Sequence, residues 1–351
     1  MMDSAATTRE NLDGYIRTIA ESFWNGDCRL FLGAGFAQGG AQLPSTAKLT
    51  SILLKDLATH GVSWLGNLLD GDEVRGNVPL SMAAEYYESM KGRPALVSRI
   101  QKELTQFKWN GKSYRMLSSL ASKRNDKRLR ILHYLYTTNY DTSVEEILHP
   151  RATTVTKSNQ HILKEETTEG VYVIHLHGVV NGRVDEWVIT DRDELREIAN
   201  QGNGSLLETQ LKDDLGKKTL VFIGYSLRDT SMKLLHYLVE RSSENSQRDH
   251  FIVLRPVDRK ESSSALAQAV SNLQAKVMES RRMLLLNLPA EEFLVRLVRR
   301  IESLEDEGMI NRLAIEFGRE PEQIRKLVEE YTQAFDLLSP RAALEILRYT
   351  L

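Results

Sequence analysis

A strand-like run of the chain ends in a glycine turn that can bind a phosphate. Arg29-Leu30-Phe31-Leu32 leads directly into Gly33-Ala34-Gly35. Backbone amides in such a turn can approach a diphosphate, because no bulky side chain stands in the way. The spacing differs from the fingerprint Gly-x-Gly-x-x-Gly, since the third glycine, Gly39, comes one residue late. The turn therefore indicates a dinucleotide phosphate site, but not the ordinary site of a hydride carrier.

Three further strand-like runs end in residues that can hold a sugar or move a proton. Asn139 and Asp141 follow one run, His177 follows the next, and Gly224 and Ser226 follow a later one. The amide of Asn139 both donates and accepts, so it can hold a ribose hydroxyl or place a water. A neutral His177 can take a proton near pH 7. Ser226 and its backbone can add phosphate or ribose contacts.

Each of these features also has a purely structural explanation. A glycine turn can serve close packing, an Asn-x-Asp segment often caps a helix, and a histidine at a strand end is often a packed residue. Their joint occurrence favours a ligand site, because the carboxyl ends of parallel strands meet at one edge of a sheet. Hydride transfer is disfavoured, because the chain shows neither an acid/base pair for a second substrate nor an acidic residue placed for the usual ribose clamp.

The elements that would position these residues alternate between strands and helices. Residues 11–27 have the apolar spacing of an amphipathic helix. Several strand-like runs are continuously apolar, as in strands covered on both faces of a parallel sheet. We therefore expect an α/β fold, a doubly wound Rossmann-like parallel sheet. The later runs are RILHYLYTTNYD, VYVIHLHG, EWVIT, KTLVFIGYSL, HFIVLRP and RMLLLNLP.

We expect two parts along the chain. Residues 11–303 form the catalytic domain, with a helical insertion at about 46–128, and residues 304–351 form a helical C-terminal appendage. Apolar residues recur at helical spacing in this appendage. Short helices need such faces buried, either against the α/β domain or against another subunit or an activating partner.

Composition excludes several classes of protein. The 351 residues carry a formal net charge of −2, which argues against nucleic-acid binding by bulk electrostatics. No apolar run approaches the roughly 20 residues of a membrane span, and the N-terminus lacks the order of a signal peptide, so we expect a cytoplasmic protein. One cysteine, Cys28, excludes an internal disulfide and a multi-cysteine zinc site.

The segments GAGFAQGGAQLPS, TTNYD, HLHG and FIGYSLRD resemble the sirtuin-like NAD-binding family in order and approximate spacing. The resemblance is closest to the bacterial branch that hydrolyses NAD in anti-phage defence. WVITDRDEL, from Trp187 to Leu195, is also similar to that branch, and the likeness covers roughly residues 15–300.

The resemblance implies a role for each matching residue. Asn139 would orient the nicotinamide ribose and the attacking water, Asp141 would bond the nicotinamide carboxamide, and His177 would act as general base. His175 has no clear family counterpart, and we expect it to support the site from behind or to pack. The remaining NAD-binding positions fall on Gly33, Ala34, Gly35, Phe36, Gly224 and Ser226.

Departures from the protein-deacylating sirtuins narrow the activity. Those enzymes carry Asp-Phe-Arg after their Gly-x-Pro, whereas here Leu43-Pro44 runs into Ser45, and Thr138 precedes Asn139 where they have Gln. They also use a four-cysteine zinc module. The resemblance therefore implies an NAD glycohydrolase with NAD as its substrate, no further cofactor and no metal.

Two other functions stay open, an NAD-dependent protein deacylase and a non-enzymatic NAD or ADP-ribose sensor that regulates a partner ATPase. An enzyme that depletes NAD must be gated. Family analogy implies a homo-oligomer or an activating partner such as a HerA-like hexameric ATPase, in abortive infection against phage. We expect neither membrane attachment nor direct nucleic-acid binding.

Overall fold

The computed structural model describes most of the chain, namely residues 9–59, 78–105, 108, 111–164, 170–199, 205–225, 248–255, 273, 276–280, 282–334 and 339–350. Within these ranges, no helix combines the length and the apolar composition that a membrane crossing requires.

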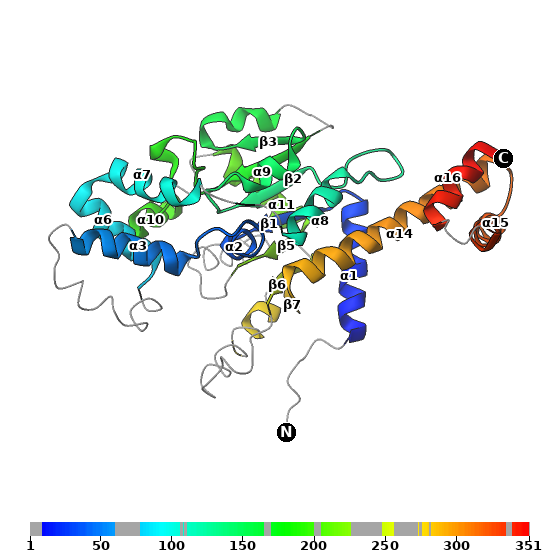
Figure 1. Cartoon of the computed structure of the whole chain (residues 1–351), viewed down its shortest axis with the longest axis horizontal. Coiled ribbons are helices and arrows are strands. Elements are labelled where there is room, and N and C mark those ends of the chain that lie inside the picture. The colour runs from blue at the N-terminus through cyan, green and yellow to red at the C-terminus, as the bar shows by residue number, and fades with distance from the viewer. Residues whose placement is uncertain are drawn as a thin grey trace, which may run out of the picture.

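Seven strands form one sheet in the order β3-β4-β2-β1-β5-β6-β7, and every pair of neighbours is parallel (Figure 1). Helices flank the sheet. This architecture confirms the predicted doubly wound, Rossmann-like α/β fold with helices in the insertion and at the C-terminus. The strands are β1 (Cys28–Leu32), β2 (Tyr134–Thr137), β3 (Ala152–Val155), β4 (Val171–His175), β5 (Thr219–Ile223), β6 (His250–Leu254) and β7 (Met283–Asn287).

The continuously apolar strands are buried on both faces because successive side chains point to opposite sides of the sheet. On β1, Leu30 and Leu32 belong to one core and Phe31 belongs to the other. The first core also takes in α1 (Arg9–Trp24), α8 (Lys112–Ser122) and the first half of α14 (Ala290–Glu316). The second core contains the buried face of α11 (Leu206–Lys217). Helices on both faces thus hold the strand ends in fixed positions.

One expected strand is wrong and one strand was not expected. The segment EWVIT does not join the sheet, since it continues from the 3-10 helix η2 (Val184–Glu186) as an irregular segment. Its amides are used elsewhere, because those of Ile189 and Thr190 both donate to Asp193 Oδ2 at 3.0 Å, at the start of α10 (Asp191–Ala199). The extra strand is β3, which reaches the edge of the sheet through α9 (Ser143–Leu148) and is followed by the 3-10 helix η1 (Lys157–Lys164).

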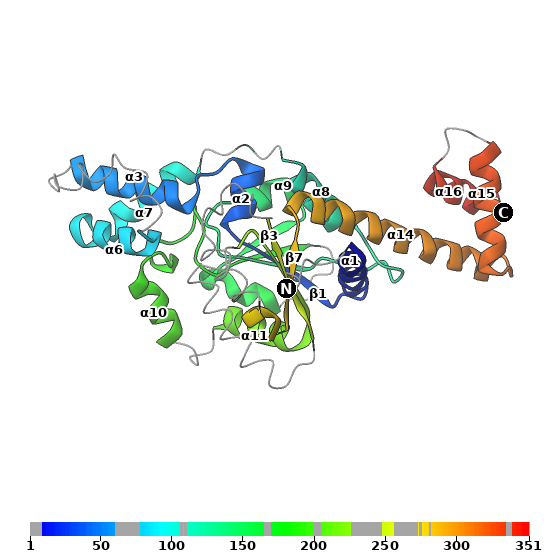
Figure 2. The same cartoon turned by 90° about the horizontal axis from the view of Figure 1, so that it is seen from below.

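A group of helices connects β1 to β2. Three of them, α3 (Thr46–Thr59), α6 (Leu80–Lys91) and α7 (Arg93–Leu104), lie at one end of the molecule in both views, whereas α2 and α8 lie near its middle (Figures 1 and 2). The group occupies the region where the sequence predicts a helical insertion. A short helix, α2, comes first and directly follows the glycine turn. The helices are α2 (Ala34–Ala41), α3 (Thr46–Thr59), α6 (Leu80–Lys91), α7 (Arg93–Leu104) and α8.

The C-terminal helices lie at the opposite end of the molecule (Figure 2). Helix α14 runs without a break through residues 303 and 304, and α15 (Pro321–Ala334) and α16 (Pro340–Thr350) fold back on its second half. Their apolar faces cover one another in a separate small core. The division into a catalytic domain and an appendage stays a proposal. The small core contains Met309, Ile310, Leu313, Ala314, Ile324, Val328, Ala343, Leu344 and Leu347.

Candidate functional site

The glycine turns after β1 and β5 are built against each other. Gly33 N donates to Ile223 O at 2.9 Å, and Gly35 N donates to Gly224 O at 2.8 Å. Gly224 has φ +79°, and a Cβ there would collide with the backbone nitrogen of Phe36. Side chains at Gly33 or Gly35 would likewise meet the Gly224 carbonyl. Only glycine permits this approach of two backbones, which brings the two turns together at the carboxyl edge of the sheet.

The same contacts reduce the number of backbone amides in the first turn that are available to bind a phosphate. The amides of Gly33 and Gly35 are already bonded, and Phe36 N donates to Gly33 O at 3.0 Å. Within the described ranges, the amide of Ala34 at the start of α2 has no such partner. The late second pair of glycines lies inside α2, where Gly40 leaves room for the ring of Tyr114. The glycines therefore serve close packing first, and the expected contact of this turn with a diphosphate stays a proposal.

Asn139 lies directly beside the first turn. Its Nδ2 donates to Gly33 O at 3.2 Å, and its backbone N donates to Thr137 Oγ1 at 3.0 Å. Thr137 Oγ1 in turn donates to Leu32 O at 2.9 Å. No hydrogen bond to Asn139 Oδ1 is formed by any residue that the structure describes. The amide is thus held in one orientation with its acceptor oxygen available.

Asp141 is buried and bonds within its own loop. It accepts hydrogen bonds from the backbone N of Ser143 at 3.1 Å and from the Ser143 hydroxyl. The Ser143 hydroxyl also lies 2.6 Å from Tyr114 Oη. Burial raises the pKa of Asp141 above its ordinary value, and the bonds from Ser143 partly oppose that rise. The Oδ1 atom takes both bonds from Ser143, so this carboxylate shapes the turn into α9.

His175 supports the Asn139 loop from behind. Its buried ring donates from Nδ1 to Asn139 O at 2.8 Å, because a carbonyl can only accept. Its Nε2 lies 2.7 Å from Oε1 of Glu145, which also accepts from Thr154 Oγ1 at 3.1 Å. Burial alone would lower the pKa of His175, but the Glu145 carboxylate outweighs it and the pKa is raised. The pair therefore favours a charged imidazolium under the loop.

His177 has the opposite environment. Thr137 of β2 and His175 of β4 are register partners, so Asn139 and His177 each stand two residues beyond a matched pair. The His177 side chain makes no hydrogen bond within the described ranges. Burial, followed by the charge of Lys157, lowers the pKa of His177 to about 4. The ring is consequently neutral at pH 7 and can accept a proton.

An aromatic pair covers the region between these two loops. The rings of Tyr140 and Trp187 are stacked, with centroids 4.6 Å apart and planes 5° apart, and Tyr140 Oη donates to Val188 O at 2.6 Å. Arg93 of α7 holds this segment, since it bonds the Trp187 carbonyl and lies 2.7 Å from Asp193 Oδ2. The helical insertion thereby fixes the segment that follows His177.

The structure brings almost all of the predicted residues to one edge of the sheet, while Ser226 lies outside the described residues. Sequence reasoning missed Glu145 and Tyr225. Tyr225 Oη donates to Leu32 O at 3.2 Å and lies 2.8 Å from Thr138 Oγ1, so it ties three strand ends together. Its position next to Gly224 was the available signal. Among the described residues, no group of three or more His, Cys, Asp or Glu is arranged to hold a metal ion. The residues placed together are Gly33, Ala34, Gly35, Phe36, Asn139, Asp141, His177 and Gly224.

Comparison with known proteins shows related sequences of this type. A protein named NAD(+) hydrolase ThsA from Enterococcus faecium is 24% identical over 248 residues, which is 69% of this chain and 46% of that protein. ThsA of Cytobacillus dafuensis is 26% identical over 58% of this chain and 40% of its own length. ThsA of Acinetobacter baumannii (strain 532279) is 22% identical, over 51% and 35% respectively. The chain thus spans less than half the length of these relatives.

A solved structure reported as "Structural Basis for the Mechanism and Regulation of Sir2 Enzymes" aligns with 87% of this chain and 99% of its own. The identity is 15% and the TM-score is 0.41. The profile of the SIR2-like domain matches residues 133–275, which include Asn139, His177 and Gly224. Residues 133–275 therefore match a SIR2-like domain, and this match supports the resemblance to the sirtuin-like family that the motifs in this segment indicate.

Proposed function

We propose that this protein is an NAD glycohydrolase, which cleaves NAD with water to nicotinamide and ADP-ribose. One observation carries the proposal: Asn139 with an available Oδ1 and His177 with a neutral ring stand at matched positions on neighbouring strands. The names of the three relatives, all NAD(+) hydrolases, support the same chemistry.

The chemistry asks little of the protein beyond positioning. Nicotinamide on ribose C1 is a cationic leaving group, so no acid is needed to expel it, and the transition state has oxocarbenium character. A water oxygen bonds to C1 while the C1–N bond breaks and its electron pair returns to the nicotinamide ring. The water proton passes to His177, directly or through a ribose hydroxyl. Asn139 Oδ1 accepts a hydrogen bond from that water or from the ribose and holds the geometry.

The remaining residues would hold the two ends of NAD. In this proposal Asp141 binds the nicotinamide carboxamide, with its carboxylate accepting a hydrogen bond from the amide NH2. The amide of Ala34, the start of α2, Gly224 and Ser226 bind phosphate or ribose. Phe36, stacked on Tyr114 with centroids 4.9 Å apart, gives this side of the site a fixed apolar wall.

The cellular role follows from the cost of unregulated NAD cleavage. We propose a gated cytoplasmic effector of anti-phage defence that depletes NAD, assembled as a homo-oligomer or controlled by a partner such as a HerA-like hexameric ATPase. Family likeness alone supports this part. NAD is the substrate, and no zinc, membrane or direct nucleic-acid contact enters the proposal.

The test follows three products in one experiment. The purified protein is incubated with NAD and an acyl-lysine peptide, with and without the candidate ATPase, and nicotinamide, ADP-ribose and any released acyl group are quantified by chromatography. We expect both products in equal amounts. Release of an acyl group from an acyl-lysine peptide, dependent on NAD, would instead establish a deacylase. NAD or ADP-ribose binding without turnover in either condition would establish a sensor.

A further inference from the structure

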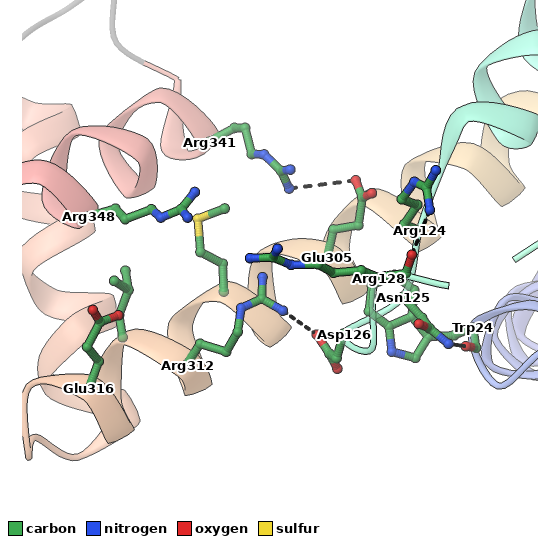
Figure 3. A pocket seen from close by; sticks show the side chains of 12 residues that line it. Trp24, Arg124, Asn125, Asp126, Arg128, Glu305, Arg312, Glu316, Arg341 and Arg348 are labelled. Atoms are coloured by element: carbon green, nitrogen blue, oxygen red, sulfur yellow. Dashed lines mark hydrogen bonds and ion pairs between the residues drawn. The ribbon is translucent and has the colours of Figure 1, made fainter. Parts of the chain in front are cut away.

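A cavity lies near the amino ends of β1 and β2, where the C-terminal helices meet the rest of the chain. It has a volume of about 370 Å³ and is bounded by the end of α1, the turn at residues 124–130, α14 and α16 (Figure 3). Trp24 precedes β1, and this turn precedes β2. Asn139 and the glycine turns follow the same strands, so the cavity is separate from the candidate NAD site.

The lining of this cavity is rich in arginine. Five arginines line it, against the three acidic residues Asp126, Glu305 and Glu316. Two further carboxylates outside the lining, Asp306 and Glu345, pair with arginines of α16. Like charges gathered around one space repel one another unless an anion lies between them. The arginines are Arg124 and Arg128 of the turn, Arg312 of α14, and Arg341 and Arg348 of α16.

The arginines differ in how they are paired. Arg312 lies 3.0 Å from Asp126, and Arg341 lies 2.9 Å from Asp306. Arg128 forms no ion pair with any described residue. In Figure 3 its side chain extends from the turn toward α14, to the region where the guanidinium of Arg312 also points. Two guanidinium groups thus face the same space, and only one of them has a carboxylate partner.

The turn holds Arg128 in an unusual conformation. Its φ is +60°, a left-handed region that L-residues other than glycine, asparagine and aspartate seldom adopt. Arg128 N donates to Asn125 O at 2.8 Å, and Asn125 Oδ1 accepts from the amides of Lys127 and Leu129, each at 3.1 Å. Asn125 Nδ2 donates to Trp24 O at 3.1 Å. A network centred on Asn125 therefore fixes the backbone from which the Arg128 side chain extends toward the cavity (Figure 3).

We propose that this cavity is a binding site for a nucleotide, held by its phosphates. Guanidinium groups bind phosphate with two parallel hydrogen bonds, and an unpaired arginine has all of its donors available. Trp24, which packs partly against the main core, also lines the cavity, and its indole is the side chain there that could stack on a base. The volume lies in the range of small-molecule sites. A bound nucleotide would contact α1 and the turn on one side and α14 and α16 on the other.

In the experiment the whole chain is titrated with ADP, with inorganic pyrophosphate and with adenosine, and calorimetry measures the binding of each. Because ADP can also enter the NAD site, the informative event is the one lost in Arg128→Asn, a change that tolerates the left-handed backbone. We expect this variant to weaken ADP and pyrophosphate binding at that site at least about 10-fold. Arg319→Ala, an exposed arginine outside the cavity, is the matched control.

A second measurement locates the site without relying on a variant. Phenylglyoxal modifies accessible arginines, and mass spectrometry identifies which ones. ADP should protect Arg128 and Arg312 but leave Arg319 unchanged. Equal binding curves for Arg128→Asn and the wild type, or no protection of Arg128, would overturn the proposal. Binding of pyrophosphate as tight as that of ADP would remove the role of the base, and adenosine binding as tight as that of ADP would remove the role of the phosphates.

Discussion

His175 and Glu145 form a buried pair beneath the Asn139 loop, with Nε2 2.7 Å from Oε1. The other ring nitrogen of His175 donates to the Asn139 carbonyl. The carboxylate of Glu145 on α9 therefore influences the Asn139 loop through the imidazole of His175. Glu145 Oε2 is buried and lacks a hydrogen bond from any described residue, so the whole of this interaction rests on Oε1.

Glu145→Gln should slow NAD cleavage without preventing folding. Glutamine keeps the shape and one polar contact but removes the charge that raises the His175 pKa, which weakens the bond to Asn139. We expect kcat to fall about 10-fold with KM little changed, because positioning rather than binding is lost. The exposed neighbour variant Glu146→Gln should behave as the wild type. A change in KM alone would contradict a positioning role.

The same pair predicts a stability that depends on pH. A raised folded pKa means that the stabilisation by His175 is fully present below its unfolded pKa of about 6.5 and is lost as pH rises through the folded value. Urea denaturation of the wild type between pH 6 and 9 should show this loss. Glu145→Gln should give a flatter profile.

Asn139→Ala should reduce NAD cleavage at least about 100-fold, because the amide positions the water or the ribose. Its removal also deletes the bond to Gly33 O. Circular dichroism and thermal melting should show that the fold persists. Asn25→Ala, an exposed asparagine after α1, is the matched control. Turnover near that of the wild type would remove Asn139 from the mechanism.

His177→Ala should also reduce the rate at least about 100-fold. Since the pKa of His177 is lowered to about 4, the wild-type ring is neutral through the physiological range. The kcat/KM profile should be flat from neutral pH to about 5 and should fall as pH approaches 4. His161→Ala changes an exposed histidine of η1 and should leave both rate and profile intact. A wild-type profile that falls near pH 6.5 would identify another base.

His250 predicts acid sensitivity of the fold. Burial lowers its pKa to about 4, and its Nδ1 accepts a hydrogen bond from Leu220 N at 3.1 Å. A lowered folded pKa gives stability above the unfolded value of about 6.5 that is lost as pH falls toward 4, by about 2 kcal/mol between pH 7 and 5. His250→Asn keeps an acceptor without a titrating ring and should lessen that loss. Urea denaturation at pH 7 and pH 5 measures the free energy of unfolding of both proteins. An equal loss of this free energy in the variant and the wild type would refute the role given to His250.

Deletion of residues 305–351 should leave a folded α/β domain. Every residue of the small C-terminal core lies within the deleted part, whereas Val298 and Ile301 of α14 belong to the main core. We expect a soluble protein that binds NAD with altered oligomer size and altered regulation. Light scattering and NAD turnover measure both, and unchanged values would assign the C-terminal helices no part in assembly. An insoluble product would show that they are needed for folding.

The sequence predicts the strands well where apolar runs are long, and it places the chemical residues at their ends. The prediction from the sequence fails where contacts with residues far away in the chain determine the local structure. EWVIT has the composition of a strand, but Asp193 takes two of its amides and Trp187 stacks on Tyr140. The strand β3 is short and rich in threonine, so its run of apolar residues is too weak to detect.

In the candidate site, too, local sequence patterns miss contacts between residues that are far apart in the chain. The sequence predicts that Gly33 and Gly224 give a phosphate access to the backbone, whereas the structure shows that each makes room for the other turn. Glu145 carried no local signal, because its partner His175 lies on a different strand and meets it only in the folded chain. Side chains that act through a neighbour are therefore the ones that motifs miss.

The contact between Gly33 and Gly224 also has a consequence during synthesis. Residue 33 leaves the ribosome early, but its turn is completed only when β5 pairs with β1, after most of the chain has been made. Such a distant pairing forms late in folding. A nascent chain that ends before residue 224 thus lacks the assembled edge, so the proposed site cannot form until β5 and the turn after it have been made.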